Sequence, residues 1–294
     1  MIPRGVRTCC PDQGEAEVAM ALQRRPRVLR VAERPAFEAG ERRGRDFTAD
    51  KVVFLAHWSD APRVTRSVST LVEQFADHGY AVLMASSAVC RGRLEWPDGL
   101  PPGVTVYRRP NIGYDFGSWA AVMDLHPGAL LAEHALVVND SLVGPFAPLD
   151  AILAGFESSG TDVWGLIDTH QDEPHLQSHW IGYHGGLLAG APLRAFWSDI
   201  RIEPTKRDII KRYEIGQTRN FAALGYSIGV QFPSSLVVSP GLNPTSIGWR
   251  RLLSFGFPFV KREIVLRPPP EVPDGFAVRQ VIEQRFGTDV MEWL

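Results

Sequence analysis

The sequence predicts an α/β fold, in which a Rossmann-like and mostly parallel sheet is flanked by helices behind an N-terminal extension. Short runs rich in β-branched and aromatic residues, such as 51–58, alternate with segments whose apolar residues recur at helical spacing. Strands that alternate with helices pair in parallel through right-handed crossovers. The sequence contains no internal repeat and no interior linker, so we predict a single domain over residues 47–294.

The first 46 residues are predicted to form a poorly ordered, Arg-rich leader with at most one short helix. They hold ten Arg and seven acidic residues, and their aliphatic residues cluster only at 18–22 and 28–31. A segment of this composition buries too little apolar surface to order itself. A basic arm that touches anionic lipid is the alternative interpretation.

The elements of the domain follow one another in regular alternation. The predicted strands are 51–58, 81–87, 104–110, 135–140, 162–168 and the strand-like run 227–232. The first predicted helix opens at 59–62, where a capping residue precedes a proline, and stops at 78–79. The further predicted helices are 115–123, 148–156, 205–213, one that ends at 224–225, and 277–286.

Composition excludes several classes of protein. The 31 basic and 33 acidic residues give a net charge of −2, too balanced for a dedicated nucleic-acid binder. The three cysteines lack metal-binding spacing and suit a reducing compartment, so we expect a cytoplasmic protein. No apolar run approaches the roughly 20 residues of a membrane span, and the start lacks the apolar core of a signal peptide. Any membrane contact is therefore expected to be peripheral.

Polar residues at strand ends mark the candidate site, because open parallel sheets bind ligands at the carboxyl ends of their strands. The first such end is 57–60, where His57 and Asp60 flank a Trp-Ser pair. The N–H groups of a helix that opens here could bind an anion. A plain Asp N-cap beside a packed tryptophan is the alternative.

The second strand end is the segment 108–119, which carries Asn111, Gly113 and Asp115. Glycines on both sides of Asp115 allow a ligand to approach the backbone closely, and Asn and Asp can bond to hydroxyls or to a base edge. The segment has neither the dinucleotide fingerprint nor a Walker loop. A capped turn with core aromatics is the alternative.

The third strand end delivers Asn139, Asp140 and Ser141. Oxygen ligands of this kind suit Mg²⁺ or Mn²⁺ bridging a diphosphate, although a single carboxylate makes a thin metal site. The histidines within 170–184 match no zinc motif, so we expect no zinc.

A basic and aromatic tail covers residues 249–267. Together with Arg108 and Arg109 it could neutralise a diphosphate, or it could rest on an anionic bilayer. A C-terminal helix that docks on the sheet with a solvated basic face is an equal alternative.

Taken together, residues 51–267 resemble the rhamnan synthesis protein F family, which is related to glycosyltransferases of the GT-A fold. The resemblance rests on RRPNIGYDFGSW, VVNDSLVGPFAPL, DVWGLID, HLQSHW, KRYEIGQTRNFAALGY and NPTSIGWRRLLSFGFPFVKREIV. It implies a GT-A-like domain that transfers a sugar with inversion from a nucleotide sugar. The implied donor is dTDP-rhamnose, and the implied acceptor is a cell-surface polysaccharide or a lipid-linked glycan.

The resemblance also implies which residues meet the donor. Asn139-Asp140-Ser141 stands where GT-A enzymes carry their Asp-x-Asp metal motif, so only Asp140 could ligate Mg²⁺ or Mn²⁺ as a charged group. Either the metal is held more weakly, or Lys and Arg neutralise the diphosphate instead. The implied donor-binding residues are His57, Asp60, Arg109, Asn111, Gly113, Asp115, Asn139, Asp140 and Ser141.

Glu214 is the candidate general base, because 213–216 resembles the acidic segment of family 2 inverting glycosyltransferases. A carboxylate there can take the proton of an attacking hydroxyl. The usual acidic pair is reduced to Tyr-Glu, and a surface glutamate paired with Lys211 or Arg212 is the alternative.

Residues 177–180 are implied to face the acceptor or the sugar. Gln177 and Ser178 match the family's Gln-Ser motif, and His179 and Trp180 could stack on a sugar ring. Core packing accounts equally well for Trp180.

Two other functions remain open on the sequence alone. The loss of the Asp-x-Asp pattern is consistent with a catalytically silent, sugar-nucleotide-binding or scaffolding subunit of a polysaccharide-assembly complex. A Rossmann oxidoreductase is disfavoured by the missing glycine fingerprint. For a transferase acting on lipid-linked glycans, we expect the cytoplasm or a peripheral place on the cytoplasmic face of the inner membrane.

Overall fold

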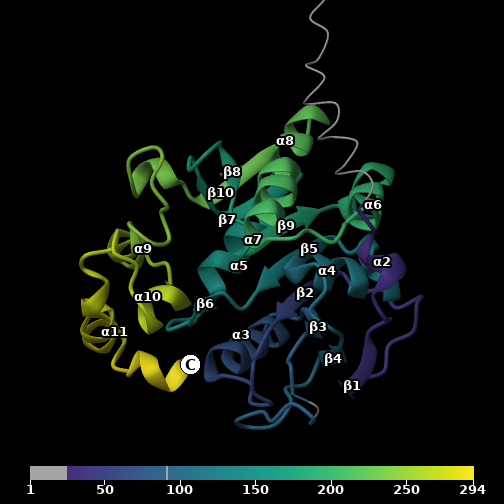
Figure 1. The fold of residues 1–294 in the computed structure, drawn as a ribbon, viewed down its shortest axis with the longest axis horizontal. Helices are drawn as coiled ribbons and strands as arrows, with labels where there is room; N and C mark the ends of the chain where they lie inside the picture. Colours follow the sequence, from purple (N-terminus) through teal and green to yellow (C-terminus); the bar gives the residue numbers. More distant parts are fainter. Residues whose placement is uncertain (1–24, 91) are drawn as a thin grey trace, which may run out of the picture.

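The computed structural model describes residues 25–90 and 92–294. A nine-stranded sheet forms its centre, with helices on both faces (Figure 1), which confirms the predicted α/β class. The strand order is β1-β4-β3-β2-β5-β9-β7-β10, with β8 beside β7. The strands are β1 (Ala36–Gly40), β2 (Lys51–His57), β3 (Ala81–Ser86), β4 (Val104–Arg108), β5 (His134–Asn139), β7 (Val163–Thr169), β8 (His175–Leu176), β9 (Trp180–His184) and β10 (Ile228–Phe232).

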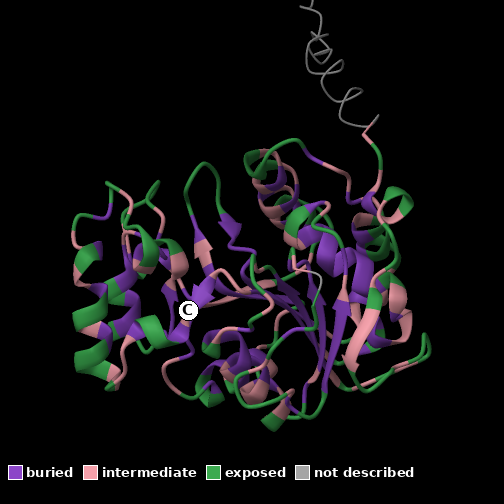
Figure 2. Cartoon of the chain, turned by 60° about the horizontal axis from the view of Figure 1, so that its bottom comes forward, coloured by how far each residue is buried: buried purple, intermediate pink, exposed green. Residues whose placement is uncertain are grey.

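The helices form a layer on each face of the sheet. On one face α3 and α5 pack against Val53 and Leu55 of β2. On the other face α4 packs against β2, and residues of α6, α7 and α8 belong to the same apolar cluster as Val52 and Phe54. The strands at the centre of the sheet are therefore buried (Figure 2). The helices are α2 (Val28–Val31), α3 (Arg66–Asp77), α4 (Tyr114–Leu125), α5 (Asp150–Glu157), α6 (Ala191–Ser198), α7 (Lys206–Ile209), α8 (Gly216–Ala223), α9 (Trp249–Ser254), α10 (Arg262–Leu266) and α11 (Val278–Phe286).

Strands β2, β3, β4 and β5 run parallel to one another, in the order β4-β3-β2-β5. Their carboxyl ends, at His57, Ser86, Arg108 and Asn139, therefore lie along one edge of the sheet. The three polar strand ends singled out in the sequence come together at this edge, which is where a parallel sheet binds its ligands.

Strands β2, β3, β4, β5, β7 and β10 run in one direction, so the sheet is mostly parallel, as predicted. Strand β9 was not predicted, and it lies antiparallel between β5 and β7. Gly182 in β9 sits against the ring of Phe156, where a Cβ atom would come within 2.2 Å of it. A glycine in a strand weakens the strand pattern, and pattern alone carries no strand direction.

Part of the predicted leader is folded. The aliphatic cluster 28–31 forms the short helix α2, and β1 extends the sheet by pairing antiparallel with β4. Val28 is fully buried, and its N–H donates to the carbonyl of Ile200 at 2.7 Å. Residues 1–24, including the cluster 18–22, lie outside the described residues. The ordered fold therefore begins well before residue 47.

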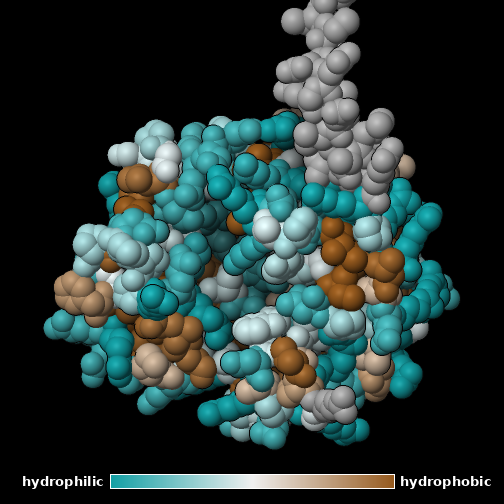
Figure 3. Space-filling view, viewed as in Figure 1, coloured by the Kyte–Doolittle hydropathy of each residue, from teal (hydrophilic) through white to brown (hydrophobic). Residues whose placement is uncertain are grey.

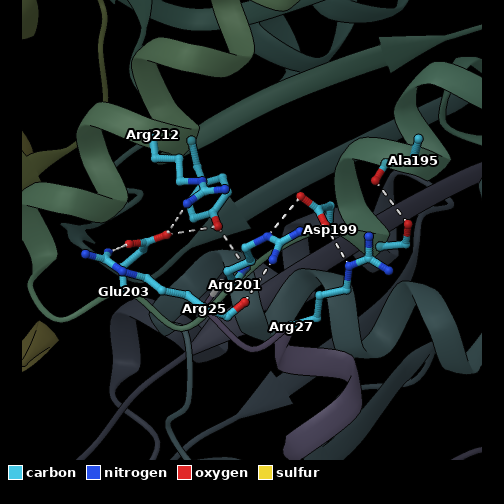
Figure 4. A network of polar contacts seen from close by, with 9 residues as sticks. Arg25, Arg27, Ala195, Asp199, Arg201, Glu203 and Arg212 are labelled. Carbon is cyan, nitrogen blue, oxygen red and sulfur yellow. Dashed lines mark hydrogen bonds and ion pairs between the residues drawn. The ribbon is translucent and has the colours of Figure 1, made fainter. Parts of the chain in front are cut away.

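Ion pairs fasten this N-terminal segment to the chain that follows α6 (Figure 4). The Glu203 carboxylate, whose side chain is 0% exposed, pairs with Arg25 on one side and with Arg212 at 3.0 Å on the other. Asp199 accepts from Arg27 at 2.6 Å. Arg212 belongs to a π-helix, Ile210–Ile215, that joins α7 to α8. The N-terminal segment thus braces the part of the chain that carries Glu214.

The C-terminal segments form a third apolar cluster beside the sheet, on the side opposite α2 and β1 (Figure 1). The short strand β11 (Val260–Lys261) pairs antiparallel with β6 (Leu142–Val143), directly after the third strand end. The basic tail is thereby carried to the carboxyl edge of the sheet. No helix in the described part of the chain combines the length and apolarity needed to cross a membrane.

Candidate functional site

The first strand end places a buried histidine beneath a carboxylate. His57 Nδ1 lies 3.0 Å from Ser86 Oγ, and His57 Nε2 lies 4.0 Å from Asp140 Oδ2. Burial lowers the pKa of His57, although the charge of Asp140 opposes the change. The N–H of Trp58 donates to Asp140 Oδ2 at 3.0 Å, so the end of β2 orients the Asp140 carboxylate.

A cavity of about 280 Å³ opens at this point. Its charged lining residues are Asp60, Arg63, Asp140 and Arg262. Asp60 is exposed and does not cap the following helix, because α3 begins at Arg66 and its cap is the Thr65 hydroxyl. The space-filling view shows a hollow near the middle of this face, between the C-terminal segments and the α7–α8 region (Figure 3).

The second strand end is a loop braced by Arg109. The guanidinium is buried and donates to Ser118 Oγ at 2.8 Å and to the Ile112 carbonyl at 2.6 Å. Burial lowers the pKa of Arg109 to about 10. Gly113 has φ +81°, and a Cβ atom there would lie 2.6 Å from Val28 of α2, so the loop requires glycine. Asn111 is exposed next to this turn.

At the third strand end, the side chain of Asn139 bonds within the protein. Its Nδ2 donates to Asp115 Oδ2 at 2.9 Å. Its Oδ1 accepts from the Ser141 N–H at 3.1 Å and from Ser141 Oγ at 2.6 Å. Asn139 therefore ties the start of α4 to the end of β5, and Ser141 is turned toward it.

Asp115 sits in an environment that favours its protonated form. Burial, and then the neighbouring charge of Asp140, raise the pKa of Asp115 to about 7, although the residue keeps some exposed surface. Glu214 adds a smaller repulsion, and Lys206 opposes it. Asp115 thus feels the charges of both Asp140 and Glu214. Carboxyl groups with strongly shifted pKa values are frequent at functional sites.

Replacing Asp115 with Asn is expected to stabilise the fold at pH 8 but not near pH 4. The folded chain keeps the Asp115 proton up to about pH 7, whereas an unfolded chain releases it near pH 3.8. Between these values the folded state binds more protons, so this group's contribution to stability falls as the pH rises. We expect a gain of about 1–3 kcal/mol at pH 8, measured by urea unfolding. An equal gain at pH 4 would contradict this explanation.

Glu214 lies in the π-helix Ile210–Ile215, and two side chains from residues 175–178 hold its carboxylate. Ser178 Oγ donates to Glu214 Oε2 at 2.7 Å, and His175 Nε2 lies 3.4 Å from Glu214 Oε1. Burial alone would raise the pKa of Glu214, but the bonds from His175 and Ser178 outweigh it, so the pKa is lowered. Burial likewise opposes the charged form of His175, but Glu214 and the Glu173 carbonyl raise its pKa.

His175 was not among the predicted site residues. Its ring is fixed at both ends, since Nδ1 lies 2.7 Å from the Glu173 carbonyl oxygen while Nε2 faces Glu214. His175 lies 39 residues before Glu214 in the sequence, and this spacing does not predict that the two side chains meet. The alternative that pairs Glu214 with Lys211 or Arg212 does not hold, because Arg212 pairs with Glu203 and Glu214 bonds to His175 and Ser178.

Residues 177–180 divide between site and core. Gln177 bonds to Asn243 and Thr245, at 3.3 and 3.2 Å. Burial lowers the pKa of His179 to about 4, and its Nε2 has no hydrogen-bond partner within the described residues. Trp180 is 1% exposed and packs on Phe75, so the sugar-stacking role expected for it is wrong and core packing holds.

The predicted metal motif has few ligands to offer. Within residues 25–90 and 92–294, no three His, Cys, Asp or Glu side chains are grouped so that they could hold a metal ion. Asn139 Oδ1 and Ser141 Oγ bond to each other, which leaves Asp140 as the charged oxygen donor of the triplet. The donor set therefore does not fit a divalent ion well.

Cations reach the same edge from the C-terminal segment. The Arg262 N–H donates to the Ser141 carbonyl at 3.0 Å, and Arg262 Nη2 lies 3.5 Å from the Asp140 carbonyl oxygen. Lys261 pairs with Glu263 at 3.0 Å. The carboxyl edge of the sheet thus combines Asp140, the partly buried base candidate Glu214 and Arg262, which suits the binding of a polyhydroxylated anion.

Comparisons with known proteins bear on this arrangement. A family model described as "Rhamnan synthesis protein F" matches residues 104–284, more than half of the chain. The chain is 27% identical over 199 residues to the virulence protein VirA of Vibrio anguillarum, a match covering 56% of this chain and 64% of VirA. It is 27% identical over 128 residues to the uncharacterized protein y4gN of Sinorhizobium fredii, covering 42% and 33%.

A shorter match joins residues of the chain to an adenine phosphoribosyltransferase of Solidesulfovibrio magneticus. It is 26% identical over 110 residues and covers 34% of this chain and 64% of that protein. The chain therefore spans less than two thirds of the length of each of these relatives. Because the names of these relatives share no activity, the reaction has to be inferred from the chemistry of the site.

Proposed function

Because the chain belongs to the rhamnan synthesis protein F family, we propose that it is a glycosyltransferase that builds a cell-surface polysaccharide. It moves a sugar, rhamnose in our proposal, from a nucleoside diphosphate sugar such as dTDP-rhamnose to a hydroxyl of a glycan or lipid-linked glycan. The anomeric configuration is inverted. The observation that carries the proposal is the oriented, partly buried Glu214 carboxylate within electrostatic reach of the donor-side residue Asp115.

Glu214 acts as the general base in this reaction. The acceptor oxygen attacks the anomeric carbon, the bond from that carbon to the diphosphate oxygen breaks, and the hydroxyl proton passes to Glu214. Ser178 and His175 keep the carboxylate ionised and aimed, at the cost of some basicity. The acceptor hydroxyl becomes acidic only as its bond to carbon forms, so an aimed, ionised carboxylate suits the step.

The donor is proposed to lie over the ends of β2, β4 and β5. His57, Trp58 and Asp60 line part of the cavity there, and Asn111 and Asp115 lie at the turn after β4, in which Gly113 packs against Val28. Asp140 faces the same cavity and orients the donor through its carboxylate. Gln177 and Ser178 lie on the Glu214 side, where the acceptor enters.

The direct test is turnover of dTDP-rhamnose with a panel of glycan acceptors, followed by NMR of the product anomer. We expect acceptor-dependent release of dTDP and an inverted product. Full activity of both Asp140→Ala and Glu214→Ala variants would contradict the site. Binding of dTDP without turnover on any acceptor would favour the second candidate, a silent sugar-nucleotide-binding subunit, which the internal bonding of Asn139 and Ser141 also supports.

We further propose that the protein works in the cytoplasm, in peripheral contact with the inner membrane where lipid-linked acceptors reside. Exposed Leu266 and Phe276 lie near Arg267 on the C-terminal segment, and such a surface suits an anionic bilayer. Co-sedimentation with phosphatidylglycerol vesicles tests the contact, and protein that stays in the supernatant would contradict it.

A further inference from the structure

We propose that Arg262 and Arg63 bind the diphosphate of the donor directly, so that donor binding needs no divalent metal. This inference rests on the proposed function. It assigns to two arginines the neutralisation of the diphosphate that a metal ion would otherwise provide. It departs from the Asp-x-Asp chemistry that the resemblance implies for the third strand end.

Asn139, Asp140 and Ser141 are the residues that would have to ligate a metal. Divalent ions that bridge a diphosphate are held through one or two carboxylates together with phosphate oxygens and water. Here the outer positions of the motif are Asn139 and Ser141, and their side chains are bonded to each other at 2.6 Å. Asp140 Oδ2 already accepts the Trp58 N–H at 3.0 Å. What remains for a metal is a single carboxylate with one oxygen already engaged.

Arg262 and Arg63 line the same cavity as Asp140. Neither guanidinium has a carboxylate oxygen within 4.0 Å among residues 25–90 and 92–294, whereas many other arginines of that part of the chain form such pairs. Planar guanidinium groups bind phosphate oxygens through two parallel hydrogen bonds. Two such groups supply as much positive charge as one divalent ion.

Arg262 is positioned by the backbone of the C-terminal segment. Pairing of β11 with β6 sets Lys261 opposite Leu142, and the Arg262 N–H bonds to the Ser141 carbonyl at 3.0 Å. Its guanidinium then lies beside the Asp140 carbonyl, 3.5 Å away, and its side chain is only half-exposed. The C-terminal segment thus fixes this cation at the strand end where the metal of an Asp-x-Asp enzyme would sit. Lys206 of α7, which also carries no ion pair among the described residues, contributes a positive charge that acts to lower the pKa of Asp115.

Calorimetric titration of the intact chain tests the inference. The probes are dTDP, UDP, GDP, CDP and inorganic pyrophosphate, each titrated once in EDTA and once in excess MgCl₂ or MnCl₂. We expect at least one nucleoside diphosphate to bind in EDTA with a dissociation constant within about threefold of that in metal. Arg262→Ala is expected to weaken this binding about 10- to 100-fold, which corresponds to loss of a charge-assisted hydrogen bond.

Matched variants separate binding from folding. Arg262→Lys keeps the charge but not the planar fork, so we expect an intermediate affinity. Arg63→Ala should weaken binding less, because this side chain is exposed. Arg285→Ala is the control, since this exposed arginine packs over Phe286 on α11. Thermal melting of each variant shows whether a loss of binding follows from a loss of structure.

The outcomes distinguish this inference from the proposed function. Binding that requires Mg²⁺ or Mn²⁺ and disappears in EDTA would overturn metal independence and leave the glycosyltransferase proposal standing. Unchanged affinity in a folded Arg262→Ala variant would overturn the role of Arg262. If none of the probes binds under either condition, the proposed function itself fails.

Discussion

Glu214→Gln is expected to lower the rate of sugar transfer by about 100- to 10,000-fold, the usual contribution of a general base. The glutamine amide cannot take the acceptor proton. It can still accept the hydrogen bond from Ser178, so the local structure should persist. Binding of the nucleoside diphosphate should stay within about threefold, because Glu214 faces the acceptor side. Initial rates with saturating donor, together with calorimetric dissociation constants, measure the two effects separately.

One control and one second variant accompany Glu214→Gln. Glu271→Gln changes an exposed carboxylate that forms no ion pair or hydrogen bond within residues 25–90 and 92–294, so it should leave the rate unaltered. His175→Asn removes the group that helps to hold the pKa of Glu214 below its usual range. The acid limb of the pH–rate profile should therefore move upward in His175→Asn. A Glu214→Gln enzyme that keeps more than a tenth of the wild-type rate would rule out Glu214 as the base.

The buried parallel strands were readable because burial on both faces leaves a continuous apolar run. Strand β2 is such a run, and its neighbours β3, β4 and β5 follow the same rule. Strand β9 (WIGYH) was missed although it contains tryptophan, isoleucine and tyrosine, because Gly182 interrupts the strand pattern. Glycine is required at this position, since a Cβ atom would collide with the ring of Phe156. The need for glycine at position 182 comes from Phe156, which is distant in the sequence, so the residues around Gly182 do not predict it.

The folded part of the leader could not be predicted for a related reason. Strand β1 joins the sheet through backbone hydrogen bonds to β4, which require no apolar composition. Arg25 and Arg27 are charged, and charged residues in a segment of this composition indicate a solvated arm. The sequence does not show that they pair with Glu203 and Asp199, which lie more than 170 residues away. The composition of residues 25–46 does not predict their order, because that order comes from contacts with distant parts of the chain.

The candidate site shows the same division between position and contact. Parallel strands meet at one edge, so the sequence alone located His57, Asp115 and Asp140 in one neighbourhood. It could not tell that Asn139 would bond to Asp115 and Ser141, nor that His175 would face Glu214. Arg262 reaches the site through the pairing of β11 with β6. Strands of two residues are too short to be predicted from the sequence pattern.

Glu203→Ala is expected to destabilise the fold by about 3 kcal/mol. Removing one partner of a buried ion pair typically costs about 3–5 kcal/mol. The lower end applies because Arg25 and Arg212 keep side-chain exposures of 31% and 23% and can recover some hydration. The carboxylate itself is 0% exposed and also bonds to Tyr213. The urea midpoint of the variant, with an unchanged slope, measures the loss.

A matched exposed pair provides the comparison. Glu173→Ala removes the partner of Arg219, where both side chains are more than half exposed, so the loss should stay below about 1 kcal/mol. Because Glu203 binds Arg212 two residues before Glu214, its loss should also loosen the π-helix and lower the transfer rate of the folded variant. Equal destabilisation by Glu203→Ala and Glu173→Ala would show that the N-terminal segment does not brace the fold through this carboxylate.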